Sequence, residues 1–348
     1  MESTLRSRPW KGNQPPQKIL VMRFQAMGDV VITLPYLQNL KRQYPNVRLH
    51  LLTRAEVAPL PEALVLFDEV IAIGGGRNAR VQFLLALLLL PKLWMQRFDA
   101  VMDLQNHRIS KIIRKVLRAK AWVEFDRSSS LSAGRRTQNT IEALWSWRIE
   151  PETFFQSRQP GRADVLLQQA GYREQHKLVV LNPAGYCPSR HWPLSAYEAF
   201  ARRWQVAYPL TQFVLLLLPA HQEAATYLET RLGDHCLNLT GKADPVEAFE
   251  ILQRCDFMLT EDSGLMHMAW VQGIPTLALF SSSRKDWSAP QGAWSMCLDS
   301  SDLECGPCLL PVCKFDDNRC LTRYTPEFVM ACAEKILPHA KPHRHVSA

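Results

Sequence analysis

The 348-residue sequence has no run of about 18 uncharged apolar residues, so no membrane-spanning helix is predicted. Residues 1–17 are polar and have no apolar core of the kind found in secretory signals, so we expect that the protein is not exported. Nine cysteines in such a protein are expected as thiols or metal ligands and not as a disulfide framework. Hydrophobic residues make up 47% and charged residues 21%, which is typical of a soluble globular protein.

Several sequence motifs that define nucleotide and metal sites are also missing. There is no phosphate loop and no zinc-metalloprotease motif. The turn near Gly28 holds one glycine, and Gly74, Gly75 and Gly76 lack the spacing of a dinucleotide-binding fingerprint. The corresponding classes of enzyme are therefore not indicated.

Positive charge is concentrated in the first half of the chain. Residues 1–160 contain 24 Lys and Arg against 13 Asp and Glu, a net charge of +11, while the remainder carries −3 and the whole chain +8. A basic half favours an anionic partner, which could be a phosphorylated substrate, a membrane surface or a nucleic acid. A basic solvent-exposed face without a partner is the alternative. No nucleic-acid reading motif is present, so we expect no nucleic-acid partner.

Short apolar runs alternate with helical patterns in both halves. We expect strands at residues 18–24, 48–53, 69–73, 100–104, 121–125, 178–181, 212–218, 236–239, 257–259 and 276–280. We expect helices at residues 30–44, 194–208, 220–232, 245–255 and 326–337, and a frayed tail at 339–348. This alternation predicts an α/β fold of two doubly wound parallel sheets, facing each other across a cleft. Residues 128–138 are predicted as a mobile loop and 156–162 as a linker, which gives domains 1–160 and 161–348.

Two stretches of the basic half are unusual. Residues 81–95 are almost entirely apolar and are flanked by cations, which fits either a helix lying in a membrane interface or a buried helix covering a sheet. Residues 108–120 carry six cations, beginning with Arg108. At helical spacing several of them share a face that could meet phosphates, or that is simply solvated.

The stretch from Thr260 to His267 links a predicted strand to a predicted helix. The first amides of a helix have no internal partner and carry the positive end of its dipole, so Ser263 and Gly264 would let a phosphate approach closely. Asp262 could reach a ribose hydroxyl. An ordinary Asp or Ser helix cap explains the same residues. Arg190, in the loop after residues 178–181, shares this carboxyl edge of the sheet and could reach a diphosphate.

Polar residues also follow the predicted strands of the first half. Asp29 lies after residues 18–24, and Asp103 and Gln105 lie at the end of residues 100–104. In open parallel sheets, ligands bind at the carboxyl ends of the strands. A helix cap is the alternative role for Asp29.

Four cysteines lie close together near the end of the chain, with the spacing C-x2-C-x4-C-x6-C. A structural zinc or iron site, reduced thiols and disulfides formed on oxidation all remain open. The four residues are Cys305, Cys308, Cys313 and Cys320.

Several motifs together resemble glycosyltransferase family nine, the ADP-heptose:lipopolysaccharide heptosyltransferase family. The stretch KILVMRFQAMGDVVITLP at residues 18–35 resembles the opening of that family, and TEDSGLMHMAWVQGIPTLALF at residues 260–280 resembles its donor-binding signature. Arg190-His191-Trp192-Pro193 is similar to its basic-x-Trp-Pro element, and Thr240-Gly241-Lys242 to its Gly-Lys turn. The resemblance covers residues 18–337.

The resemblance implies a GT-B fold, in which the active site lies between two Rossmann-like domains, and inverting transfer of heptose from ADP-heptose without a catalytic metal. It implies an acceptor-binding first domain and a nucleotide-sugar-binding second domain. Asp29 would be the general base, and Arg190, at a position where the family usually has Lys, would neutralise the diphosphate. Asp262 would bind ribose or sugar. The remaining donor-binding residues would be Ser263, Gly264, His267 and Lys242.

Other partners and functions stay open at this point. We expect an anionic lipid-linked glycan acceptor, contacted by Asp103, Gln105 and Arg108, and a cytoplasmic enzyme lying peripherally on the inner membrane. Another nucleotide sugar, a protein acceptor, or a non-catalytic module that binds anions or membranes on the same fold are the alternatives.

Overall fold

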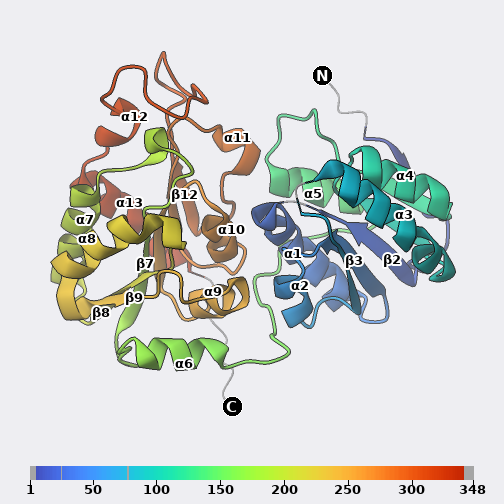
Figure 1. Ribbon diagram of the computed structural model, residues 1–348, viewed down its shortest axis with the longest axis horizontal. Coiled ribbons are helices and arrows are strands. Elements are labelled where there is room, and N and C mark those ends of the chain that lie inside the picture. The colour runs from blue at the N-terminus through green and yellow to red at the C-terminus, as the bar shows by residue number, and fades with distance from the viewer. Residues whose placement is uncertain (1–4, 25, 77, 341–348) are drawn as a thin grey trace. The chain divides into compact units, whose positions relative to one another are not determined.

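The computed structural model describes residues 5–24, 26–76 and 78–340, and the chain divides into two compact units, Met1–Arg158 and Gln159–Ala348. Each unit is built on one six-stranded sheet with helices (Figure 1). None of the described helices is long and apolar enough to cross a membrane.

The first unit contains a sheet in the order β1-β6-β5-β2-β3-β4. Its strands are β1 (Ser7–Arg8), β2 (Lys18–Met22), β3 (Arg48–Arg54), β4 (Glu69–Ile73), β5 (Ala100–Asp103) and β6 (Ala121–Glu124). Its helices are α1 (Met27–Gln43), α2 (Pro59–Ala63), α3 (Ala79–Met95), α4 (Arg108–Leu117) and α5 (Ala133–Glu142). All pairs are parallel except β1–β6. Strands β3 and β4 are added on one side of β2, and strands β5 and β6 are added on its other side.

Helices α3 and α4 lie side by side and cover one face of this sheet (Figure 1). They bury Leu20, Met22 and Val101 of the central strands beneath Leu93 and Ile113. Helix α1 lies on the opposite face, as the right-handed connection from β2 to β3 requires, and α5 packs against α1.

The second unit contains a fully parallel sheet in the order β12-β11-β10-β7-β8-β9. Its strands are β7 (Lys177–Asn182), β8 (Thr211–Leu215), β9 (Cys236–Asn238), β10 (Phe257–Glu261), β11 (Thr276–Leu279) and β12 (Ser295–Leu298). Its α-helices are α6 (Arg162–Gln169), α7 (Leu194–Ala207), α8 (Gln222–Leu232), α9 (Pro245–Leu252), α10 (Gly264–Trp270), α11 (Lys285–Ser288), α12 (Arg319–Thr322) and α13 (Pro326–Ile336), and four short 3-10 turns complete it: η1 (Pro188–Arg190), η2 (Pro219–His221), η3 (Gly233–His235) and η4 (Leu337–His339).

The core of this unit is rich in aromatic side chains. Helices α7, α8 and α13 cover one face of the sheet, where Trp204 stacks on Phe257 of β10 with ring centroids 4.8 Å apart. Large fully buried aromatic residues contribute strongly to core stability because each removes a large apolar area from water.

Some predicted boundaries were wrong. The predicted loop at 128–138 is helical from Ala133, because Ser132 caps α5 and the side chain of Gln138 is buried against the carbonyl oxygen of Ile149. The predicted linker ends early, since α6 begins at Arg162. The edge strands β1 and β12 were not predicted, and most of the predicted frayed tail lies outside the described residues.

Candidate active site

The structure explains why two distant loops of the second unit meet. In the order β9-β8-β7-β10-β11-β12, consecutive connections run to opposite sides of the β7–β10 pair. At such a switch point the loops that leave the two strands diverge, and ligands of open α/β sheets bind there. Arg190 lies in the connection after β7, and Asp262 comes directly after β10. The topology therefore brings these two predicted donor-binding residues to one place.

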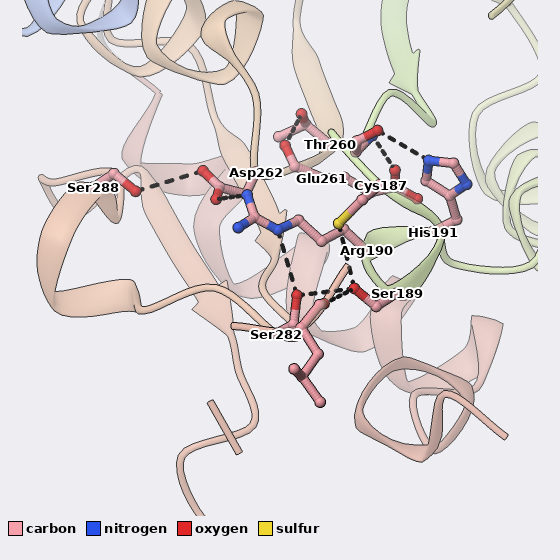
Figure 2. A network of polar contacts seen from close by, with 11 residues as sticks. Cys187, Ser189, Arg190, His191, Thr260, Glu261, Asp262, Ser282 and Ser288 are labelled. Atoms are coloured by element: carbon pink, nitrogen blue, oxygen red, sulfur yellow. Dashed lines mark hydrogen bonds and ion pairs between the residues drawn. The ribbon is translucent and has the colours of Figure 1, made fainter. Parts of the chain in front are cut away.

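Arg190 and Asp262 form an ion pair at this point. Arg190 Nη1 lies 3.0 Å from Asp262 Oδ2, and Arg190 Nε donates to Ser282 Oγ at 3.4 Å (Figure 2). Ser288 Oγ donates to the other Asp262 oxygen at 3.5 Å. The two side chains are 21% and 15% exposed, and Arg190 Nη2 has no partner within the described part of the chain. The guanidinium is thus held in place with one edge still able to donate to an anion.

Glu261 shapes the loop that carries Arg190, and the sequence did not single it out as a site residue. Its carboxyl group is fully buried and accepts the backbone N–H groups of Gly185 at 2.6 Å and Trp192 at 2.7 Å. Burial raises the pKa of Glu261 to about 8, although these two amides act in the opposite direction. An acidic residue at the end of a predicted apolar strand, directly before an Asp, is the signal that sequence inspection could have used.

Gly185 is required at its position by a close approach. A Cβ atom there would lie 2.6 Å from the carbonyl oxygen of Arg190 and 2.9 Å from Glu261 Oε2. These distances are shorter than side chains tolerate, so the turn between β7 and Arg190 can close only around glycine.

Ser263 is the N-cap of α10, as the alternative sequence interpretation expected. Its Oγ accepts the N–H of Met266 at 3.3 Å and an N–H of Asn182 Nδ2 at 2.8 Å. Asn182, which ends β7, also donates to Thr260 Oγ1, so its amide ties the two strands together at the switch point. Next to it, Gly264 faces open space, because a Cβ atom there would meet no other atom within 4 Å.

The other two predicted donor-binding residues lie outside this group. His267 is buried in α10, where its Nδ1 accepts the indole N–H of Trp270 at 3.1 Å. Lys242 follows the edge strand β9, three strands from β10, and its Nζ donates to the carbonyl oxygen of Asn238. His267 therefore supports α10 from within, and the structure does not bring Lys242 to the Arg190–Asp262 pair.

Asp29 lies in the first turn of α1 in the first unit, not in a turn before the helix. Its Oδ2 accepts the N–H of Ala26 at 2.9 Å, and its Oδ1 pairs with Nη2 of the buried Arg23 at 2.9 Å. The side chain therefore caps the helix, which was the alternative role in the sequence analysis, and it is still 41% exposed. The Arg23 guanidinium also stacks on the ring of Phe125, 4.9 Å from its centroid, and donates to the carbonyl oxygen of Leu104.

The three predicted acceptor residues have different environments. Asp103 is fully buried and accepts the N–H of Asn106 at 2.7 Å, and burial raises its pKa to about 6, so it shapes a turn and presents no surface to an acceptor. Gln105 accepts the N–H of Phe24 at 2.8 Å and thereby holds the turn before α1. Arg108 is exposed at the start of α4.

The four clustered cysteines line one small cavity of about 20 Å³. They are free thiols, and the described residues contain no group of three or more such side chains arranged to hold a metal ion. A structural zinc or iron site at these cysteines stays a prediction. The cysteine-bearing loop contacts the surroundings of Arg190. The N–H of Leu309 donates to the carbonyl oxygen of Ser282, and Ser189 Oγ donates to that of Leu310.

Comparison with known proteins decides the family. The profile of glycosyltransferase family 9 (heptosyltransferase) matches residues 88–318, which is most of the chain. The chain belongs to this family. It is therefore a glycosyltransferase, as the sequence motifs predicted.

Individual relatives are distant but cover most of the chain. A lipooligosaccharide heptosyltransferase 2 of Haemophilus influenzae is 23% identical over 305 residues, 78% of this chain and 85% of that protein. The family 9 glycosyltransferase of Veillonella parvula superposes with a TM-score of 0.77 at 18% identity, covering 92% of this chain and 97% of the other. The ADP-heptose heptosyltransferase II of Escherichia coli gives 0.66 at 18% identity, covering 92% and 98%. The predicted fold class, two Rossmann-like domains of the GT-B kind, is confirmed.

Proposed function

We propose that this glycosyltransferase moves a heptose from ADP-heptose to an anionic, lipid-linked acceptor of the lipopolysaccharide inner core, with inversion and with no metal in the chemical step. The observation that carries the donor assignment is the Arg190–Asp262 pair at the switch point between β7 and β10. The names of its relatives, among them lipopolysaccharide heptosyltransferases of Salmonella typhimurium and Escherichia coli, support the sugar and the acceptor class. We propose that it works at the cytoplasmic face of the inner membrane, because a lipid-linked acceptor is anchored in a membrane.

The reaction requires one bond to form while another breaks. An acceptor hydroxyl attacks the anomeric carbon of the heptose from the face opposite the diphosphate, and the bond from that carbon to the diphosphate oxygen breaks. Asp29 takes the proton of the attacking hydroxyl as general base. Arg190 stabilises the negative charge that develops on the leaving ADP, because its guanidinium is fixed and always charged.

The remaining residues position these groups. Arg23 orients Asp29, Ser263 and Asn182 fix the start of α10, and Gly264 leaves room for a phosphate oxygen near that helix start. Asp262 serves a ribose or sugar hydroxyl and restrains Arg190. We assign acceptor binding to the first unit, with Arg108 as an exposed cation at the carboxyl end of β5, and nucleotide-sugar binding to the second unit.

The test compares Asp29→Asn with a matched control. Asp164 is also a carboxylate in an ion pair with arginine and is equally exposed, 40% against 41%, but it lies on α6 at the start of the second unit. We expect that Asp29→Asn lowers kcat by about 100-fold or more while ADP affinity stays within about twofold, because a general base acts on the chemical step alone. Asp164→Asn keeps wild-type turnover.

Product masses after incubation with ADP-heptose and a series of truncated core lipids give turnover, and titration calorimetry gives ADP affinity. If Asp29→Asn keeps more than a tenth of wild-type kcat, Asp29 is not the base. If the wild-type enzyme transfers heptose to none of these acceptors, the proposed donor or acceptor is wrong.

A further inference from the structure

Helix α3 exposes an apolar stripe along the outside of the first unit. Its exposed large side chains recur every three or four residues, which places them on one face of the helix. The most exposed are Leu88 at 76%, Met95 at 69%, Trp94 at 64% and Leu84 at 60%. Val81 and Leu87 extend the same face. A 17-residue helix is about 25 Å long, so the stripe is far more than a single surface leucine.

Folding explains only the inner face of this helix. Ala86 and Leu93 are buried against the sheet, and Phe83, Leu89 and Leu90 pack beside them. The sequence left open whether this segment is a buried helix or an interfacial one. In the structure the inner face of α3 is buried, and the outer face has the exposed apolar character of an interfacial helix. A helix that covers a sheet normally has a polar outer face, so the outer stripe of α3 needs another explanation.

Exposed cations lie at both ends of α3 and on the adjacent α4, and acidic residues are missing from both helices. Neither α3 nor the adjacent α4 contains an Asp or Glu. Several exposed cations form no ion pair within the described ranges 5–24, 26–76 and 78–340: Arg80, Arg97, Arg108, Lys115 and Arg118. An apolar stripe flanked by unpaired positive charge matches the two layers of an anionic bilayer surface, which are phosphate headgroups and acyl chains.

We infer that the outer face of α3, with the cations of α4, docks the enzyme onto an anionic phospholipid bilayer. Helix α3 lies parallel to the surface, with Leu84, Leu88 and Trp94 inserted below the headgroups. Lys115 and Arg118 contact lipid phosphates. This inference rests on the proposed function for its choice of a lipid surface, because an acceptor anchored in a membrane must be reached there.

The test measures vesicle binding by flotation of the full-length protein, without substrates. Vesicles of phosphatidylcholine alone are compared with vesicles that contain phosphatidylglycerol. We expect binding to the anionic vesicles only, a loss of at least tenfold in the partition coefficient for Leu88→Gln with Trp94→Gln, and about fivefold per cation for Lys115→Gln and Arg118→Gln.

Matched controls come from the second unit. Val206 and Leu218 are exposed apolar residues, 85% and 70%, and Lys335 is an exposed cation. Val206→Gln with Leu218→Gln, and Lys335→Gln, should bind vesicles like the wild type. Melting temperatures of all variants show that each one folds.

Three outcomes overturn the inference: no binding of the wild type to anionic vesicles, equal binding by the Leu88→Gln, Trp94→Gln variant, or a concentration-dependent dimer that this variant abolishes. The last result would assign the stripe to a second copy of the chain. Turnover on a deacylated, water-soluble core oligosaccharide separates the two proposals. The stripe variant should keep that turnover, whereas absent turnover with intact vesicle binding rejects only the proposed function.

Discussion

The guanidinium of Arg23 pairs with Asp29 across a distance of 2.9 Å while Arg23 itself is almost completely buried. The Phe125 ring and the carbonyl oxygen of Leu104 therefore hold the Arg23 guanidinium in place. Arg23 in turn holds the partly exposed Asp29 carboxylate. This arrangement sets the direction of the Asp29 side chain before any substrate binds.

Replacement of Arg23 tests this positioning. In Arg23→Lys the stacking on Phe125 is lost and one point charge replaces a planar fork, so Asp29 loses its fixed orientation. We expect kcat to fall roughly tenfold or more, since small misplacements of a reacting group cost that much, while KM for ADP-heptose is unchanged. Steady-state kinetics check this. If the KM for ADP-heptose rises about tenfold while kcat is unchanged, Arg23 acts in substrate binding instead.

Arg190→Gln tests the anion site of the second unit. The variant loses a charge-assisted contact to the diphosphate, so ADP affinity should fall about tenfold or more in titration calorimetry. Arg254, which pairs with Asp164, supplies the control variant Arg254→Gln. Asp262→Asn distinguishes two roles. Weaker binding of ADP-heptose would show that Asp262 contacts the donor directly. Unchanged binding would mean that the only role of Asp262 is to hold Arg190 in place.

Two glycines should respond to alanine in opposite ways. Gly185→Ala places a Cβ against the backbone of Arg190 and the Glu261 carboxylate, so both the melting temperature and ADP affinity should fall. Gly264→Ala meets no protein atom, so the melting temperature should stay the same or rise slightly while ADP affinity falls. Scanning calorimetry with ADP titration measures both. Unchanged ADP affinity in Gly264→Ala would contradict the proposal that a phosphate binds at the start of α10.

Glu261 predicts a pH dependence of stability. Because burial raises the pKa of this carboxyl group from 4.5 to about 8, the folded state holds the proton more tightly than the unfolded state. Its contribution to the free energy of unfolding is complete below about pH 4.5 and is lost as the pH rises through about 8.

The variant Glu261→Gln cannot ionise and therefore lacks this component. Chemical denaturation at pH 5, 6, 7 and 8 should show a wild-type advantage over the variant that shrinks as the pH rises. A difference that stays constant across this range would mean that Glu261 has the same charge throughout.

The sequence alone determined the fold class and the family of the enzyme. Apolar runs of strand length alternating with helical patterns are a local property, so the parallel sheets could be predicted from them. The motifs at residues 18–35 and 260–280 indicated the family, because they resemble the opening and the donor-binding signature of glycosyltransferase family nine. Polar helices such as α5 were missed, since only packing shows that Gln138 is buried.

Tertiary structure decided which of these residues meet. Arg190 and Asp262 are 72 positions apart and become neighbours only because β7 and β10 pair at the switch point of the sheet. The same packing buried Asp103, placed Lys242 beyond the edge strand, and gave Glu261 its role in holding the Arg190 loop. It also left one apolar face of α3 uncovered, which periodicity could not show because this helix is apolar on both sides.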